Sequence, residues 1–177
     1  EPPSAPFDLG VTRPAAPAVS LGAATSGDPE TVALVATVVN VWGEESAPSN
    51  PVLFDRQAGP NATYTVTHTA TAGQQAINGI NFYRTYPSLQ GTTEYFLINS
   101  TPASLSGGVA TLVDASDAPQ TTTNLTSTEW DTPPALPNNL TYVGNGFFAI
   151  GSGKDIVFSE PYRPHAWPYR MTLPHGI

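Results

Sequence analysis

The chain has no cysteine, few charges and no long apolar run, and each shortage excludes a class of protein. Without cysteine, neither a disulfide framework nor a thiolate metal site can form. No apolar run approaches the roughly 20 residues of a transmembrane helix, so we expect no membrane span. Charged residues make up 11% of the 177 residues, against about 25% in an average globular protein.

The charges that are present are mainly acidic. Six Lys and Arg stand against 14 Asp and Glu, which gives a formal net charge of −8. A protein that binds nucleic acid through its phosphates needs a basic patch or stripe. We therefore expect no direct sequence-specific binding of nucleic acid, and the acidic balance favours solubility.

Proline and threonine are abundant, and together they predict an all-β fold. The chain has 19 prolines, roughly twice the usual share of about 5%, and threonine suits the pleated surface of a strand. Residues 1–29 hold six of the prolines. Because proline fixes φ and cannot donate to a ladder, this segment is predicted to be an extended, polyproline-like linker or an arm lying on a neighbour.

Strand patterns begin at residue 31. In 31–41 both alternating sets of side chains are apolar, which is typical of a central strand covered on both faces. In 62–70, Tyr64, Val66 and His68 alternate with threonines, which is the clearest strand pattern of the chain. Further strands are predicted over 52–55, 74–85, 93–99, 108–113, 140–143, 147–150 and 155–158, and no helix is expected anywhere. The Thr/Asp/Pro-rich segment 114–137 is long for a loop, which favours a segment draped over another surface.

Two groups of residues carry a family resemblance. The stretch Trp42-Gly43-Glu44-Glu45-Ser46-Ala47-Pro48-Ser49 resembles the "GES-x-PS" loop of fibronectin type III-like sandwiches, and Phe82-Tyr83-Arg84-Thr85 resembles their "Y-R-T" strand. The string from Phe158 to Pro168 (FSEPYRPHAWP), with Trp130 and the prolines that follow it, resembles tail and virion structural proteins of bacteriophages. The resemblance covers about residues 31–168.

The resemblance implies a non-enzymatic structural protein of a phage tail, of the nozzle or hub type, in the virion and assembled in the host cytoplasm. Its expected partners are copies of itself in a symmetric ring and neighbouring tail, portal or adaptor proteins. After the Pro-rich linker or arm over 1–29, it implies a fibronectin type III-like sandwich over 30–134 and the truncated start of a second, blade-like β module over 135–177. The loop-like motif precedes the Tyr-Arg strand, so either the sandwich is permuted or two partial modules meet.

A secreted carbohydrate-binding or adhesion sandwich is the alternative function. The triplets that begin at Asn61, Asn99, Asn124 and Asn139 match the glycosylation pattern Asn-x-Ser/Thr. The three tryptophans, Trp42, Trp130 and Trp167, could stack on sugar rings, although a role in the core or at an interface is favoured because aromatic side chains bury so much area.

The remaining reactive residues favour structural roles, and we predict no catalytic, cofactor or metal site. Asp114, Asp117, Glu129 and Asp131 suit a calcium site in composition, but their spacing is not that of an EF-hand, and turn chemistry is favoured. Glu44 and Glu45 are adjacent, so in a strand they would point to opposite faces, and solvated loop charges are expected instead of a glycosidase pair.

Histidine and serine residues are also expected to be structural. His165 lies among prolines and aromatics, which predicts a packed corner with a hydrogen bond to the backbone, since only His68 and His175 could complete a metal site. Ser46, Ser49 and Ser159 lack the Gly-x-Ser-x-Gly pattern of a nucleophile elbow. The glycine-rich pieces at 107–108 and 151–154 are predicted to be hairpin turns.

Overall fold

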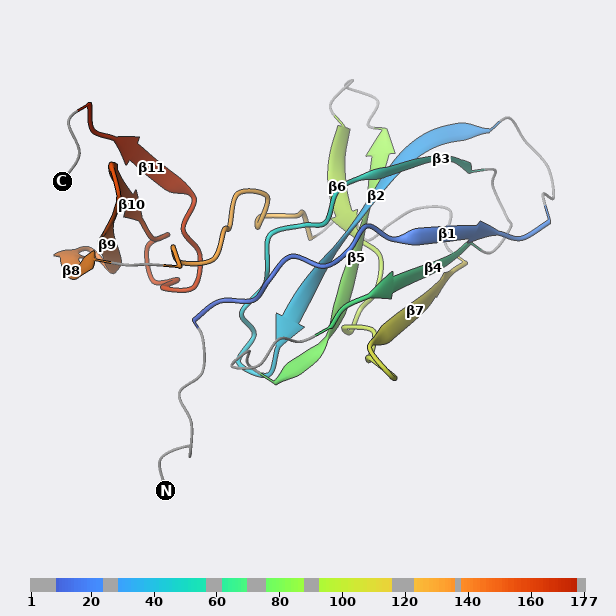
Figure 1. Cartoon of the computed structure of the whole chain (residues 1–177). Coiled ribbons are helices and arrows are strands. Elements are labelled where there is room, and N and C mark those ends of the chain that lie inside the picture. The colour runs from blue at the N-terminus through green and yellow to red at the C-terminus, as the bar shows by residue number, and fades with distance from the viewer. Residues whose placement is uncertain are drawn as a thin grey trace.

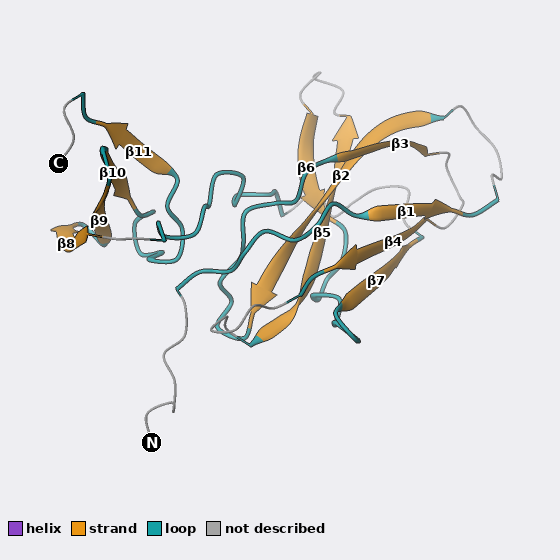
Figure 2. Ribbon diagram, in the orientation of Figure 1, coloured by secondary structure: helices purple, strands orange, loops and turns teal. Residues whose placement is uncertain are grey.

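The protein forms a two-layer β-sandwich followed by a separate small sheet, as seen in a computed structural model that describes residues 9–23, 29–56, 62–69, 76–87, 93–115, 123–135 and 138–174. One layer has the strand order β3 (Val52–Arg56), β2 (Glu30–Asn40), β5 (Ile77–Pro87) and β6 (Thr93–Leu97). The other has the order β1 (Ala18–Leu21), β4 (Ala62–Thr67) and β7 (Val109–Asp114), and every pairing is antiparallel. Figure 1 shows the two layers, and Figure 2 shows strands and loops without any helix in the described residues.

The sandwich core lies between the two layers and follows from strict alternation along the strands. Leu34 and Val38 of β2 and Phe82 of β5 pack from one sheet, and Tyr64 and Val66 of β4 pack from the other. Each of these side chains is fully buried. The outward residues of β2 are buried as well, which confirms that this strand is central and covered on both faces.

An extended arm precedes β1 and closes one side of the core. Among its residues, Val11, Pro14 and Pro17 are buried while the residues between them are exposed. A spacing of three is the period of a polyproline II helix, which has three residues per turn and no internal hydrogen bonds. Val11 belongs to the sandwich core. The burial spacing over 11–17 fits the polyproline-like character expected for 1–29, and the same segment also supplies strand β1, which pairs with β4.

A buried ionic cluster joins the two layers. Asp114 of β7 lies 3.2 Å from Nε of Arg84 of β5 and 4.0 Å from Nε of Arg56 of β3. The hydroxyl of Tyr64 donates to the same carboxylate at 2.9 Å. Burial, together with the Asp114 carboxylate, raises the pKa of Tyr64 far above its usual value. One carboxylate therefore balances two buried guanidinium groups between the sheets.

The small sheet at the C-terminal end is a four-stranded meander. Its order is β11 (Tyr169–Thr172), β10 (Asp155–Phe158), β9 (Phe147–Ser152) and β8 (Asn138–Gly144). The β8–β9 turn has positive φ at Asn145 and Gly146, the conformation that a two-residue hairpin turn requires. Figure 1 shows this sheet beyond one end of the sandwich, connected to it by the segment after β7.

The sequence predicted the all-β class and nine of the strands in the described residues, with ends that differ by a few positions. It did not predict β1 or β11, whose four residues each lack a long alternating pattern. The hairpin turns expected at 107–108 and 151–154 are present, because Ser106 pairs with Val109 and Ser152 with Asp155. Among the described residues, no helix could cross a membrane.

We predict that Asp114→Asn destabilises the sandwich by about 3–5 kcal/mol, because it removes a buried carboxylate that contacts two buried guanidinium groups. Asp155→Asn is the matched control, since Asp155 pairs with the exposed Arg170 at 3.5 Å, and an exposed pair contributes about 1 kcal/mol or less. Urea unfolding of both variants measures the difference. Equal losses in the two variants would contradict the structural role of the buried cluster.

Candidate functional site

The loop after β2 is held along the edge of that strand by two serines. The amide of Val38 donates to Oγ of Ser46 at 2.9 Å, and the amide of Ala36 donates to Oγ of Ser49 at 3.0 Å. The backbone completes the pairing, because the amides of both serines donate back to the carbonyls of these two β2 residues. An irregular loop with a proline cannot supply a full ladder of backbone groups, so the hydroxyls satisfy amides that would otherwise be buried unpaired.

The side chain of Glu45, in the same loop, lies on the outer face of the sheet. Its Oε1 accepts hydrogen bonds from the hydroxyls of Thr37 and Tyr83, the latter at 2.8 Å, and a longer one from Asn81 at 3.5 Å. Burial and the nearby Glu45 carboxylate raise the pKa of Tyr83 well above its usual value. Glu45 was expected to be a solvated loop charge, but it is half-buried and anchors the loop to β2 and β5.

Glu44 was also expected to be a solvated loop charge, but it is half-buried between its own turn and His165. Its Oε2 accepts a hydrogen bond from Nδ2 of Asn40, whose Oδ1 accepts the amides of Trp42 and Glu44 and so closes the turn. Its Oε1 lies 3.8 Å from Nδ1 of His165. Glu45 therefore anchors the loop to the sheet, and Glu44 contacts the segment that follows β10.

Trp130 and His165 form the centre of the junction between the sandwich and the C-terminal sheet. The guanidinium of Arg163 lies 4.5 Å from the centre of the Trp130 ring, and the His165 ring meets Trp130 edge-on at 5.7 Å. Such cation–π and aromatic pairs each contribute on the order of 1 kcal/mol. The amide of Trp167 also donates to the carbonyl of Asp131 at 3.0 Å.

The N-terminal arm completes this junction. Gly10 has a φ of +85°, and a Cβ at this position would lie 3.1 Å from the carbonyl oxygen of His165 and 3.3 Å from Cδ of Pro133. Arg13 lies 3.8 Å from Asp131 across an exposed surface. Three segments far apart in the sequence, the arm, the 130–135 linker and the 163–167 segment, thus meet at one place.

Burial lowers the pKa of His165 below its usual value, although the Glu44 carboxylate opposes the shift. His165 is packed against an aromatic ring, as predicted, but the ring is that of Trp130, and its Nδ1 faces Glu44 instead of a backbone carbonyl. Its Nε2 is buried without a hydrogen-bond partner in the described part of the chain. The neutral ring is therefore the form that this junction favours.

The C-terminal sheet has two apolar faces, and among the described residues one of them is covered more completely than the other. Ile150 and Val157 pack beneath Trp167, whose indole Nε1 donates to the carbonyl of Pro164 at 2.8 Å. Ser159 accepts the amide of Phe148 at 2.9 Å and fixes the start of this covering segment. Trp167 therefore covers one face of the sheet, and the segment that carries it also contacts the sandwich.

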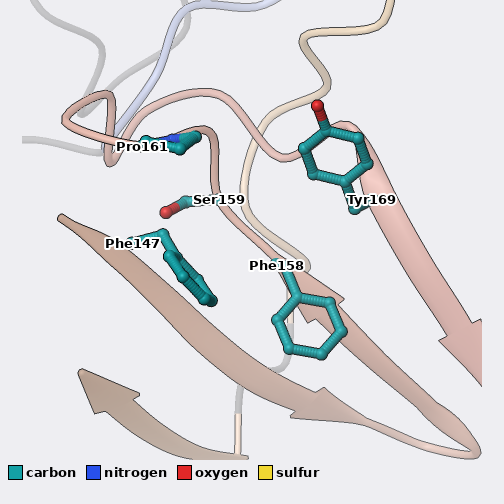
Figure 3. Close-up of a pocket in the computed structure, with 5 residues that line it drawn as sticks. All are labelled: Phe147, Phe158, Ser159, Pro161 and Tyr169. Atoms are coloured by element: carbon teal, nitrogen blue, oxygen red, sulfur yellow. The ribbon is translucent and has the colours of Figure 1, made fainter. Parts of the chain in front are cut away.

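The other face of this sheet is only partly covered by the described residues. By register, β9, β10 and β11 place Phe147, Ala149, Gly151, Ile156, Phe158, Tyr169 and Met171 on it. We call these seven residues the open face. Tyr169 is 53% exposed and Met171 is 55% exposed. Figure 3 shows Phe147, Phe158 and Tyr169 around a hollow of about 330 Å³ that Ser159 and Pro161 also line.

Two smaller polar hollows, each of about 260 Å³, adjoin at Thr128 between β6 and the C-terminal sheet. One is lined by Glu94, Tyr95, Asn124, Leu125 and Thr128. The other is lined by Thr126, Thr128, Glu129, Trp130, Glu160, Pro168 and Tyr169. They combine carboxylates, an amide and hydroxyls with aromatic rings, and Nδ2 of Asn124 donates to Glu94 at 2.8 Å.

The acidic residues that the sequence grouped as a possible calcium site are not brought together. Asp114 is buried with Arg84, Glu129 and Asp131 lie by the junction, and Asp117 lies outside the described residues. No group of three metal-ligating side chains occurs among the described residues. His68 is buried at the end of β4 and belongs to no metal-ligand group among the described residues. His175 lies outside the residues that the structure describes.

The three tryptophans have different environments. Trp167 and Trp130 are buried, the latter to 9% exposure, as a role in the core or at an interface requires. Trp42 is 59% exposed at the tip of the β2 loop. Of the four glycosylation-like positions, Asn99 is buried and its amide donates to the carbonyls of Ile80 and Thr101, while Asn61 lies outside the described residues.

The open face was not predicted from the sequence. The signal for it is present, because both alternating sets of side chains in 147–150 and 156–158 are apolar. Such a pattern predicts a strand covered on both faces, and only one cover is found within the described residues. Comparison with known families, curated proteins and solved structures finds no match to this chain.

We predict that acidification weakens the junction through His165. A histidine whose folded pKa is lowered contributes stability that is present above its unfolded pKa of about 6.5 and is lost as the pH falls below that value. His165→Asn, which keeps a neutral polar side chain, should therefore lose less unfolding free energy than the parent between about pH 7.5 and pH 5.5. Urea unfolding at both pH values measures this, and an identical pH dependence in the two chains would contradict it.

Proposed function

We propose that this chain is part of a non-enzymatic structural protein of a bacteriophage tail, of the nozzle or hub type, that assembles as a symmetric homo-oligomer. The observation that carries the proposal is the open face of the C-terminal sheet. Exposed apolar patches on a folded protein mark sites of association, and the exposed Tyr169 and Met171 adjoin an apolar hollow lined by the half-buried Phe147 and Phe158.

The motifs that resemble phage tail proteins have structural roles that support this proposal. Within the string 158–168, Ser159 satisfies a strand amide, Arg163 and His165 contact Trp130, and Trp167 covers the small sheet. The loop at 42–49 holds the edge of β2 and contacts His165 through Glu44. In this proposal both motifs fix the position of one β module relative to the next, so that a rigid surface is presented to neighbouring subunits. We also propose that the sandwich is a permuted form of the fibronectin type III-like fold.

Met171→Lys tests assembly through the open face, with Thr172→Lys as the matched control. The two residues are adjacent on β11, are both exposed, and point to opposite faces of the sheet. Burying an unpaired ammonium in an apolar contact is costly. We expect Met171→Lys to raise the concentration at which the chain assembles by roughly ten-fold or more, which corresponds to about 1.4 kcal/mol per ten-fold step.

Light scattering over a range of chain concentrations measures this shift, and Thr172→Lys should leave the assembly unchanged. If the parent chain assembles and both lysine variants behave like it, the open face is not the contact. If the parent chain remains monomeric and antibodies against it find no such protein in phage particles, the proposed function is wrong.

Carbohydrate binding remains the second candidate, and the two adjoining polar hollows favour it. A sugar ring needs an apolar face to stack on and hydrogen-bonding groups around it, and Tyr95, Asn124 and Glu94 offer both. Trp130 does not serve as a stacking platform, because its ring is buried beneath Arg163.

If the hollows bind sugars, a glycan array should show binding that Asn124→Ala reduces by about ten-fold, since a lost hydrogen bond to a ligand costs on the order of 1 kcal/mol or more. Asn50→Ala, at an exposed position of the loop before β3, is the control and should bind as the parent does. The absence of binding to any glycan would remove this candidate.

A further inference from the structure

A second surface of the chain is, like the open face, without charged side chains. The outer side of the sheet β1-β4-β7 consists, by register, of Ala18, Ser20, Thr63, Thr65, Thr67, Val109, Thr111 and Val113. None of these side chains carries a charge, and Val113 is 57% exposed. We call this set the threonine face. The opposite side of the same sheet forms the sandwich core, with Tyr64 and Val66.

The charges of the chain are divided unequally between the parts that carry these two faces. Residues 138–177 contain three Lys or Arg and two Asp or Glu, whereas residues 1–137 contain three and twelve. The C-terminal part therefore has a net charge of +1 and the remainder a net charge of −9. Two sandwiches repel each other, but the C-terminal sheet of one copy does not repel the sandwich of another.

We propose that the open face of one copy packs against the threonine face of a second copy, in a head-to-tail contact. This inference rests on the proposed assembly function and names the surfaces and the partner. Two uncharged sheet faces can stack at the usual separation of about 10 Å, as sheets do in sandwiches. The exposed side chains of Tyr169 and Met171 then lose their contact with water against Val109 and Val113.

Head-to-tail contact explains why the two faces differ. A contact with two-fold symmetry would use the same surface on both copies, whereas a heterologous contact uses two different surfaces and closes into a ring when its rotation allows. In a contact of the open face with itself, the two C-terminal sheets, each with a small positive charge, would meet. In the head-to-tail contact, that sheet meets the strongly acidic sandwich.

Single-cysteine chains test the contact directly, because the natural chain has no cysteine. Val113→Cys places a thiol on the threonine face and Met171→Cys places one on the open face, and both positions are exposed. One chain carries a size tag, the two are mixed, and a short bis-maleimide reagent is added. We expect a crosslink between the tagged and untagged chains in the mixture, and neither chain should crosslink to itself.

Asn50→Cys replaces Val113→Cys in the control mixture, and it should give less than about one tenth of the crosslink, since Asn50 lies on neither face. Crosslinking of Met171→Cys to itself would overturn the head-to-tail contact in favour of a symmetric one. Chains that assemble without the mixed crosslink would overturn this contact and leave the proposed assembly function standing. Chains that remain monomeric at every concentration would contradict both.

Discussion

An apolar sheet face must be removed from water, and this constraint determines how each sheet of the chain is placed. In the sandwich the two layers cover each other, and Val11 of the arm adds to the core between them. In the C-terminal sheet the segment 159–168 covers one face with Trp167. On the open face, Tyr169 and Met171 stay exposed within the described residues, and the proposed association between copies would cover them.

Where strands meet irregular segments, polar side chains pair with backbone amides that would otherwise be buried without a partner. Ser46, Ser49 and Ser159 each accept a strand amide, and Asn99 does the same for Phe82 of β5. Because a buried amide without a partner costs more than a hydrogen bond gains, these side chains allow loops rich in proline and glycine to lie on sheets. The junction at Trp130 and His165 depends on loops held in this way.

Alternation of side chains made the fold class and most strands predictable, since patterns such as that of Tyr64, Val66 and His68 are local. The four-residue strands β1 and β11 were missed, because their pairing is decided by residues elsewhere in the chain. Strand β1 pairs with 62–65 of β4, and β11 pairs with 155–158 of β10. Asp114 was grouped with other acids by its place in a Thr/Asp-rich segment, but Arg84, thirty positions earlier, is its partner. The half-buried environment of Glu45 likewise depends on Tyr83 of another strand.

Met171 is the single methionine of the chain and lies on the open face, so its oxidation reports on that face alone. The measurement is the rate at which peroxide converts it to the sulfoxide as the chain concentration is raised. If copies cover the open face, the rate falls as the chain assembles and returns to its dilute value when the chain is diluted. A rate that is the same at all concentrations, and equal to that of a free methionine in solution, would contradict the central claim.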